Sequence, residues 1–414
     1  MKTDYDVIVC GGGPAGIAAS IMASRLGSQV LLLERYGRLG GMATSGLVQP
    51  IMGSVESPLV ESLLTGLGGR HVDFEHFDLN AARLVQDSGA DILLHCLVTA
   101  TQMRDQQVTG VSCATKAGRL ELSGKVFVDA TGDGDVAFMA GAEFEQGRPG
   151  DCLLQPVSIM FRISGVDERS ALQCGSEEQA MAISVNGKTW HELVAEAQKN
   201  GLLPQTIGVV RLYSTHRKGE RGVNATQVNG IDGTDVRDLT RAELEGRRQA
   251  DQVLTFLRRY APGYSDAYIS AMPAVVGVRE TRRFLGTAYL DRHDLLEGRR
   301  RVDAVVNGAS FPIDIHNPAG DGQAEGFAAQ VKPYDIPFGC LLPKQIDGLL
   351  LAGRCISGSH DAHASYRVMA IALATGAAAG VAAALAHRYG VQPRALDVKK
   401  VQEALAEPAG SGDA

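Results

Sequence analysis

Glycines near the start of the chain have the spacing of a phosphate-binding turn. Gly11, Gly13 and Gly16 follow an apolar segment, and Pro14 stands where a helix would begin. In such a turn the first glycine permits a sharp bend, the second lets backbone approach a phosphate, and the third lets the helix pack against the strand. Proline has no backbone N–H, but an N–H in the first turn of a helix has no intrahelical partner, so Pro14 is compatible with a helix start. The free N–H groups of that turn, which includes Ala15, would face an anion.

A carboxylate completes this pattern. Glu34 ends a second apolar segment, Val30–Leu33, that follows the predicted helix. In this position a carboxylate accepts hydrogen bonds from the ribose hydroxyls of an adenosine. The order of strand, turn, helix, strand and acid therefore predicts a site for the ADP half of a dinucleotide.

Other side chains offer proton transfer and anion binding. His316, His360 and His363 carry imidazoles, which titrate near neutral pH and serve as general acids or bases. The alternative for each histidine is a structural role, capping or packing beside a helix. Arg279, with Arg282 and Arg283 close by in the sequence, could bind a carboxylate through two hydrogen bonds.

Two further kinds of chemistry find no support in the sequence. His360 and His363 lack a carboxylate or thiolate that would complete a recognisable metal-ligand set, so no metal site is predicted. No G-x-S-x-G segment of the kind that presents a serine nucleophile is present either.

Three more glycine-containing segments extend the dinucleotide pattern. Arg38–Thr44 holds paired glycines that would let a loop lie flat against a cofactor. Lys125–Asp135 is an apolar strand that leads into Ala-Thr-Gly-Asp-Gly-Asp, and Gly348–Arg354 is a third strand that leads into Ala-Gly-Arg. Together these motifs resemble the FAD-dependent oxidoreductases of the glutathione-reductase-like flavoprotein superfamily, and most of all the group known simply as FAD-dependent oxidoreductase.

The resemblance spans nearly the whole chain and is weakest over residues 165–265. Besides the glycine segments it is carried by Arg279-Glu280 with Arg282-Arg283, by Pro312–His316, and by Leu350–His360 with Ser365–Met369. It implies FAD as the cofactor, with the binding residues Gly11, Gly13, Pro14, Ala15, Gly16, Glu34, Arg35, Gly40, Gly41, Met42, Ala43, Val98, Thr131, Gly132, Gly353, Arg354, Ser365 and Tyr366.

Two details of the resemblance concern the flavin. A helix beginning near Ser365 would direct its positive N-terminal end at the pyrimidine edge of the ring. Many flavin hydroxylases have Gly-Asp at the last turn, whereas this chain has Gly353-Arg354, which argues against a hydroxylase. The alternative for Arg354 is a salt bridge under the turn.

The expected fold is α/β. A Rossmann-like FAD-binding domain, with a parallel sheet, helices and a small antiparallel meander, would comprise residues 1–150 and 333–400. An inserted α+β substrate domain would comprise residues 151–332, and residues 401–414 a C-terminal tail. Alternating residues at Gln107–Thr115 and Arg119–Val128 predict the hairpin of the meander. Helical patterns occur at the following segments: Phe77–Gln86 with Asp78 as N-cap, Gln179–Ile183, Trp190–Lys199 and Arg237–Tyr260.

Composition is that of an ordinary globular protein. Of 414 residues 45% are hydrophobic and 21% charged, and the net charge of −7 predicts no nucleic-acid partner. The seven cysteines include no C-x-x-C pair and no signal peptide is apparent, so we expect reduced thiols and a cytoplasmic location. Val368–Ala386 is uncharged over a membrane-spanning length, but its Ala and Gly content favours a buried helix, so no membrane partner is predicted.

The predicted function is that of an FAD-dependent dehydrogenase or oxidase. A small organic substrate would lose a hydride to flavin N5, and oxygen or another acceptor would reoxidise the flavin. Catalysis would involve His316, His360 or His363, with Arg279 as the anion-binding residue. The alternatives are a flavin monooxygenase and a non-catalytic or electron-transfer flavoprotein subunit, and self-association is left open. A second G-x-G-x-x-G is absent, which argues against a separate nicotinamide domain.

Overall fold

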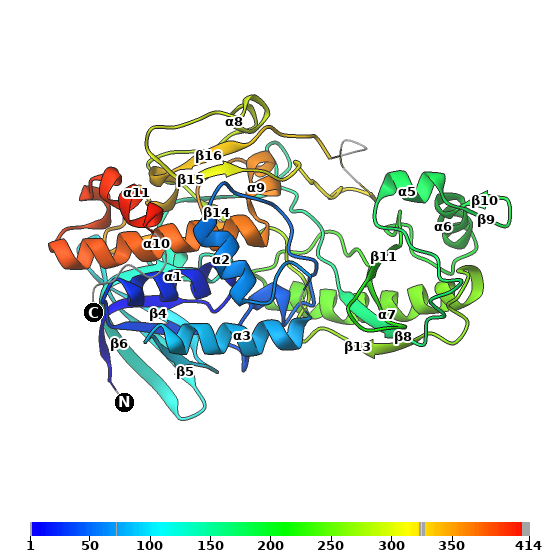
Figure 1. Ribbon diagram of the computed structural model, residues 1–414, viewed down its shortest axis with the longest axis horizontal. Coiled ribbons are helices and arrows are strands. Elements are labelled where there is room, and N and C mark those ends of the chain that lie inside the picture. The colour runs from blue at the N-terminus through cyan, green and yellow to red at the C-terminus, as the bar shows by residue number, and fades with distance from the viewer. Residues whose placement is uncertain (1, 72, 323, 325–327, 408–414) are drawn as a thin grey trace.

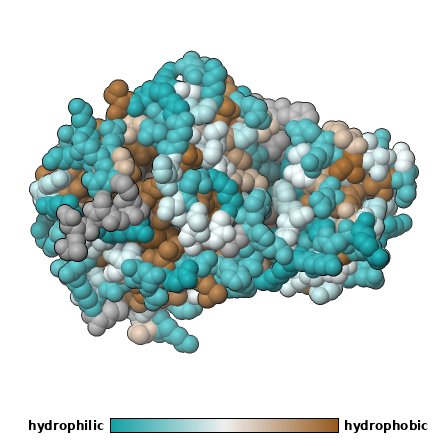
Figure 2. All heavy atoms as spheres, in the orientation of Figure 1, coloured by the Kyte–Doolittle hydropathy of each residue, from teal (hydrophilic) through white to brown (hydrophobic). Residues whose placement is uncertain are grey.

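The computed structural model describes residues 2–71, 73–322, 324 and 328–407. Figure 1 shows a larger body built from the N-terminal and C-terminal thirds of the chain, and a smaller body built from the middle. Hydrophilic and hydrophobic residues are interspersed on the face shown in Figure 2.

The main sheet of the larger body combines parallel and antiparallel strands. The order β3-β2-β1-β6 is parallel, β17 adds a further parallel strand beside β6, and β4 and β5 form an antiparallel meander with β6. The strands are β1 (Asp4–Cys10), β2 (Val30–Leu33), β3 (Asp91–Leu93), β4 (Leu97–Arg104), β5 (Gln107–Thr115), β6 (Gly118–Asp129) and β17 (Leu349–Leu351). Ile8 of β1 lies between Leu31 and Phe127, fully buried, as expected for a parallel strand covered on both faces. The predicted α/β fold with a Rossmann-like sheet is confirmed.

Helices and smaller sheets complete this body. Its helices are α1 (Pro14–Arg25), α2 (Pro58–Gly66), α3 (Phe74–Asp87), α4 (Asp135–Met139), α8 (Arg292–Glu297), α9 (His360–Tyr366), α10 (Met369–Tyr389) and α11 (Val398–Ala406). Two antiparallel pairs lie beside them: β7 (Phe144–Gln146) with β14 (Arg282–Phe284), and β15 (Ala304–Ala309) with β16 (Tyr334–Pro337).

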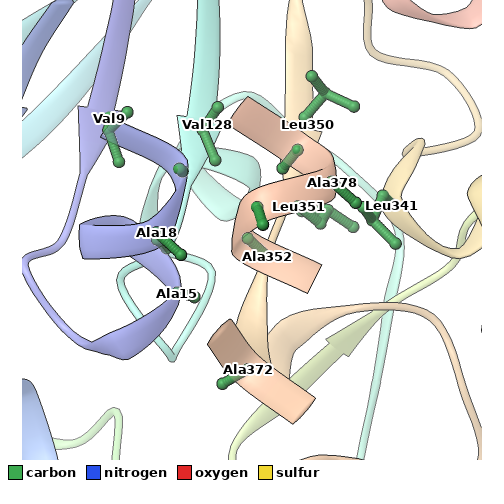
Figure 3. Close-up of a cluster of buried hydrophobic side chains, with 14 of the residues drawn as sticks. Val9, Ala15, Ala18, Val128, Leu341, Leu350, Leu351, Ala352, Ala372 and Ala378 are labelled. Atoms are coloured by element: carbon green, nitrogen blue, oxygen red, sulfur yellow. The ribbon is translucent and has the colours of Figure 1, made fainter. Parts of the chain in front are cut away.

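Helices α1 and α10 pack unusually close together because both present small residues. A Cβ atom at Gly376 would lie 2.0 Å from the Ala15 carbonyl oxygen, and one at Gly380 would lie 2.2 Å from that of Ala19. Figure 3 shows alanines from both helices in one buried cluster. Among the described residues α10 alone is long and apolar enough to cross a membrane, and 94% of that stretch is buried inside the protein. This burial identifies α10 as a core helix.

The smaller body has its own sheet and its own hydrophobic core. Its strands are ordered β11-β12-β8-β13, and a short hairpin pairs β9 with β10. The elements are β8 (Met160–Ser164), α5 (Glu177–Ala182), β9 (Ser184–Val185), β10 (Lys188–Thr189), α6 (Trp190–Lys199), β11 (Arg211–Ser214), β12 (Arg221–Asn224), α7 (Val236–Tyr260) and β13 (Tyr268–Ala271). Trp190 and Phe256 meet in the core with ring centroids 5.0 Å apart.

Two clusters of buried hydrophobic residues divide the described chain. The cluster of the smaller body runs from Val157 to Val276. The cluster of the larger body includes Tyr5 to Ala142 and resumes at Phe284. The domain boundaries at residues 150 and 332 stay predictions. Phe284, which precedes residue 332 in the chain, packs with the larger body.

Two local predictions were wrong. Helix α3 begins at Phe74 and its N-cap is Asp73, whose carboxylate accepts from His76 N at 2.9 Å. Asp78 lies inside the helix and accepts from Leu39 N at 2.9 Å instead. No helix begins near Ser365, because α9 ends at Tyr366 and Val368 is extended as the N-cap of α10.

Candidate active site

A cavity of about 970 Å³, including its open mouth, lies at the carboxyl ends of the parallel strands. Open α/β sheets bind ligands at this edge. Most of the predicted cofactor-binding residues line the cavity: Gly11, Gly13, Pro14, Ala15, Glu34, Arg35, Gly41, Met42, Val98, Thr131, Gly132, Gly353 and Arg354.

The glycine turn has the geometry that its spacing predicts. Gly11 has a φ of +103°, and a Cβ atom there would lie 2.4 Å from the Ala130 carbonyl oxygen. A Cβ at Gly16 would lie 1.8 Å from Gly11 O, so only glycine allows α1 to pack this close to the turn. At Gly13 nothing lies within 4.0 Å of the Cβ position except Gly41 Cα, so the backbone there is open to a ligand. Gly16 does not line the cavity but acts through this packing.

Glu34 organises the turn as well as facing the cavity. Its Oε2 accepts from Gly12 N at 2.7 Å and its Oε1 from Tyr36 N at 2.8 Å. Burial raises the pKa of Glu34, and the two backbone hydrogen bonds oppose that rise. Each carboxylate oxygen has a second lone pair, so a ribose hydroxyl can still donate to it.

The paired glycines hold a loop against this turn. Gly40 N donates to Gly12 O at 2.8 Å, and a Cβ at Gly41 would lie 3.0 Å from Gly13 Cα. Met42 lines the cavity as a result, whereas Gly40 and Ala43 lie behind it. Ala43 is fully buried.

Two arginines lie where the first cavity meets a second. The residues common to both linings are Met42, Arg354, Arg367 and Met369. Arg354 forms a salt bridge with Asp133 at 2.5 Å, and Arg367 donates to Asp314 Oδ2 at 3.1 Å. Arg354 therefore both forms the salt bridge under the turn and lines the cavity. The Nε atoms of Arg354 and Arg367 are buried and have no hydrogen-bond partner among the described residues.

The second cavity, of about 1460 Å³ including its open mouth, lies between the two bodies. Apolar side chains such as Met52, Phe311 and Met369 line one part of it. Arg211, Tyr213 and Asn224 from β11 and β12 line another part, together with Arg279 and His316. Concave sites with an apolar wall and a few convergent polar groups are typical of small-molecule binding.

His316 is kept neutral in this cavity. Only 7% of its surface is exposed, and its Nε2 lies 3.5 Å from Asp314 Oδ2. Burial lowers the pKa of His316 to about 4, the positive charge of Arg279 lowers it further, and Asp314 opposes both effects. The imidazole therefore carries no charge at neutral pH and can accept a proton.

The structure does not bring the other two histidines to either cavity. His360 Nδ1 lies 2.8 Å from Glu280 Oε1 in the core. The ring of His363 is fully buried against Tyr366, with centroids 5.4 Å apart. Ser365 and Tyr366 also line neither cavity, and their hydroxyls bond to Phe311 O and Ile356 O. The sequence indicated that α9 follows the last turn, but not which way its side chains face.

A sequence profile described as FAD dependent oxidoreductase matches residues 6–405. The chain belongs to this family. The cofactor of this family is FAD, as predicted.

Individual proteins resemble the chain only in part. Digeranylgeranylglycerophospholipid reductase 1 of Methanococcoides burtonii is 27% identical over 197 residues, which cover 40% of this chain and 46% of the relative. Thiamine thiazole synthase of Methanococcus aeolicus is 30% identical over 153 residues, 32% of this chain and 57% of the relative. The chain thus spans about half the length of these curated relatives.

The fold recurs in a solved structure. A geranylgeranyl bacteriochlorophyll reductase-like protein from Thermoplasma acidophilum superposes with a TM-score of 0.50 at 14% identity, over 97% of this chain and 82% of that one. At this level of identity the likeness shows a shared fold.

The residues of the first cavity fit FAD. The open backbone at Gly13 and the N-terminus of α1 suit a pyrophosphate, and Glu34 suits a ribose. The unpartnered Nε atoms of Arg354 and Arg367 are donors for which an acceptor-rich flavin edge would provide partners. Helix α10 begins at Met369 beside them, so its positive end replaces the predicted helix N-terminus near Ser365.

Sequence reasoning missed several residues of the two cavities. Arg367 and Met369 stand inside a segment that carries the family resemblance, so their position was a usable signal. The short strands β11 and β12 carry Arg211, Tyr213 and Asn224. These strands lie within residues 165–265, where the family resemblance is weakest and no motif marks the three residues.

Proposed function

We propose that the enzyme oxidises a small organic substrate by removing a hydride from one of its carbons, with oxygen or another carrier as the final electron acceptor. The observation that carries the proposal is the continuity of the two cavities at Met42, Arg354, Arg367 and Met369. FAD in the first cavity would supply the hydride acceptor at this junction. A place among glutathione-reductase-like flavoproteins is part of the same proposal.

The side chains of the second cavity would handle the rest of the reaction. His316, neutral at pH 7, accepts the proton that the substrate O–H or N–H releases as the hydride leaves. Asp314 stabilises the resulting imidazolium across their 3.5 Å contact. Met52 and Phe311 exclude water from the apolar part of the cavity, and the charges of Arg354 and Arg367 favour electron density on the cofactor.

Reduction of a substrate double bond is the second candidate. It is favoured by the similarity to digeranylgeranylglycerophospholipid reductase 1, whose name states that direction of electron flow. The charged residues of the second cavity, four arginines among them, distinguish the oxidation proposal from the binding of a purely apolar lipid chain.

Anaerobic mixing of the holoenzyme with a metabolite panel tests the proposal. Bleaching of the flavin absorption band by a panel member, without NAD(P)H, would support oxidation of that compound. Bleaching by NAD(P)H alone would contradict the proposal and favour a monooxygenase. If only chemically reduced enzyme reacts with a panel member, the reductase candidate replaces it.

A further inference from the structure

Among the residues that the structure describes, one of the four arginines that line the second cavity forms no ion pair. Arg211 forms an ion pair with Glu177, Arg367 with Asp314, and Arg354 with Asp133. Arg279 forms no ion pair with any residue that the structure describes. Its guanidinium donates from Nη1 to Pro156 O at 2.8 Å, which leaves its other N–H groups available.

The position of Arg279 makes this charge unfavourable in the absence of an anion. Burial lowers the pKa of Arg279 to about 9, the Arg367 charge nearby acts in the same direction, and the negative charge of Asp314 opposes both effects without forming an ion pair with Arg279. Glu178, also at the cavity, is exposed and forms no ion pair among the described residues. A charge in this setting costs free energy unless an opposite charge joins it. An incoming carboxylate would relieve that cost and could form two parallel hydrogen bonds with a guanidinium.

The lining around Arg279 is polar on one side and apolar on the other. A small recess that adjoins the second cavity is also lined by Arg211, Asn224, Arg279 and His316. The part of the second cavity that meets the first is bordered by Met42 and Met369. A ligand that fits both parts carries a charged group at one end and an apolar body toward the FAD site.

We propose that the substrate is a small organic carboxylate whose charge lies against Arg279, while its apolar part extends toward the junction with the FAD cavity. The inference rests on the proposed function, since it assigns the substrate class of that site. It also explains why a half-buried arginine stands near a neutral histidine: the bound carboxylate offsets the Arg279 charge that otherwise opposes protonation of His316.

Binding of matched acid and amide pairs tests the proposal without turnover. Acetate, benzoate and phenylacetate, and the amide of each, are titrated into FAD-loaded enzyme, with calorimetry and the flavin spectrum as readouts. At least one acid should bind saturably, and roughly 10- to 100-fold more tightly than its amide, as expected for the loss of a charge-assisted hydrogen-bonded pair.

Substitutions at Arg279 identify the residue responsible. Arg279→Met should weaken the acid by a similar factor of about 10 to 100 and leave the amide unchanged, and Arg279→Lys should retain part of the affinity. Arg169→Met, which removes a 92% exposed arginine, is the matched control and should bind like the native enzyme. Flavin content and circular dichroism verify that each variant is folded.

Two results would overturn the proposal: no acid in the panel binds better than its amide, or folded Arg279→Met binds the acid as tightly as the native enzyme. Failure of the proposed function looks different. In that case an acid binds through Arg279, yet no carboxylate bleaches the flavin under anaerobic conditions.

Discussion

At the scale of single residues, the chemistry depends on how burial sets the charge of each side chain. His316 and Arg279 are neighbours in one cavity, and the protein keeps the first neutral and the second positive. A neutral imidazole is the form that can accept a proton, and burial keeps His316 in that form at neutral pH while making it a weaker base than a free imidazole.

Replacing His316 should slow the reductive half-reaction. His316→Gln keeps a hydrogen-bonding side chain but cannot take up the proton, so flavin reduction by the true substrate should fall about 10²- to 10⁴-fold while FAD stays bound. Stopped-flow absorbance measures this rate. His293→Gln, at an exposed position on α8, should reduce at the native rate. A native rate in His316→Gln would assign the proton to another group or to water.

The same histidine should make stability depend on pH. Its folded pKa of about 4 lies below the ordinary value of 6.5, so between these values the unfolded chain binds a proton that the folded one does not. The free energy of unfolding should therefore be fully retained above pH 6.5 and should fall by about 3 kcal/mol as the pH drops to 4. Urea unfolding at several pH values measures it, and the loss should be smaller by that amount in His316→Gln. An identical pH dependence in the two proteins would disprove the shifted pKa.

At the scale of elements, the cofactor site depends on the packing of α1 against α10. The first turn of α1 lines the FAD cavity, and its position is set by the contact of Ala15 with Gly376. This contact therefore links the glycine turn near residue 11 to helix α10, which lies far from it in the sequence.

Adding a methyl group at this contact should weaken FAD binding. In Gly376→Ala the new Cβ would overlap the Ala15 carbonyl, and relief of that overlap must separate the helices. Overpacking of this kind typically costs about 1–3 kcal/mol. We expect a lower free energy of unfolding and a lower flavin-to-protein ratio after dialysis. Ala182→Val adds bulk at an exposed position of α5 and should change neither quantity, and full flavin retention in Gly376→Ala would show that the contact is dispensable.

Elements were predictable where the signal is local. The glycine spacing, the Gln107–Thr115 hairpin strand and the helical repeats of α6 and α7 each depend on neighbours in the sequence, and the structure contains them. The direction in which a short helix faces depends on distant partners. For α9 those partners are Glu280 and the core around Tyr366, and no pattern within α9 reports them.

At the scale of the whole molecule, the candidate active site depends on the arrangement of the two bodies. The first cavity belongs to segments with recognisable motifs, so its residues could be identified from the sequence. The second cavity draws on residues as far apart as Met42, Arg211 and Arg279 and becomes a site only when both bodies are in place. Of its polar residues, sequence reasoning identified Arg279, His316 and Arg354 but not Arg211, Tyr213 and Asn224 on the strands β11 and β12.

The location of the flavin ring tests this account most directly. A crystal structure of the enzyme purified with its FAD should show the pyrophosphate at the N-terminus of α1 and the ring at the junction formed by Met42, Arg354, Arg367 and Met369. The ring should open onto the cavity that contains His316 and Arg279. A ring that points away from this cavity, or that is separated from it by protein, would contradict both the site and the function proposed for it.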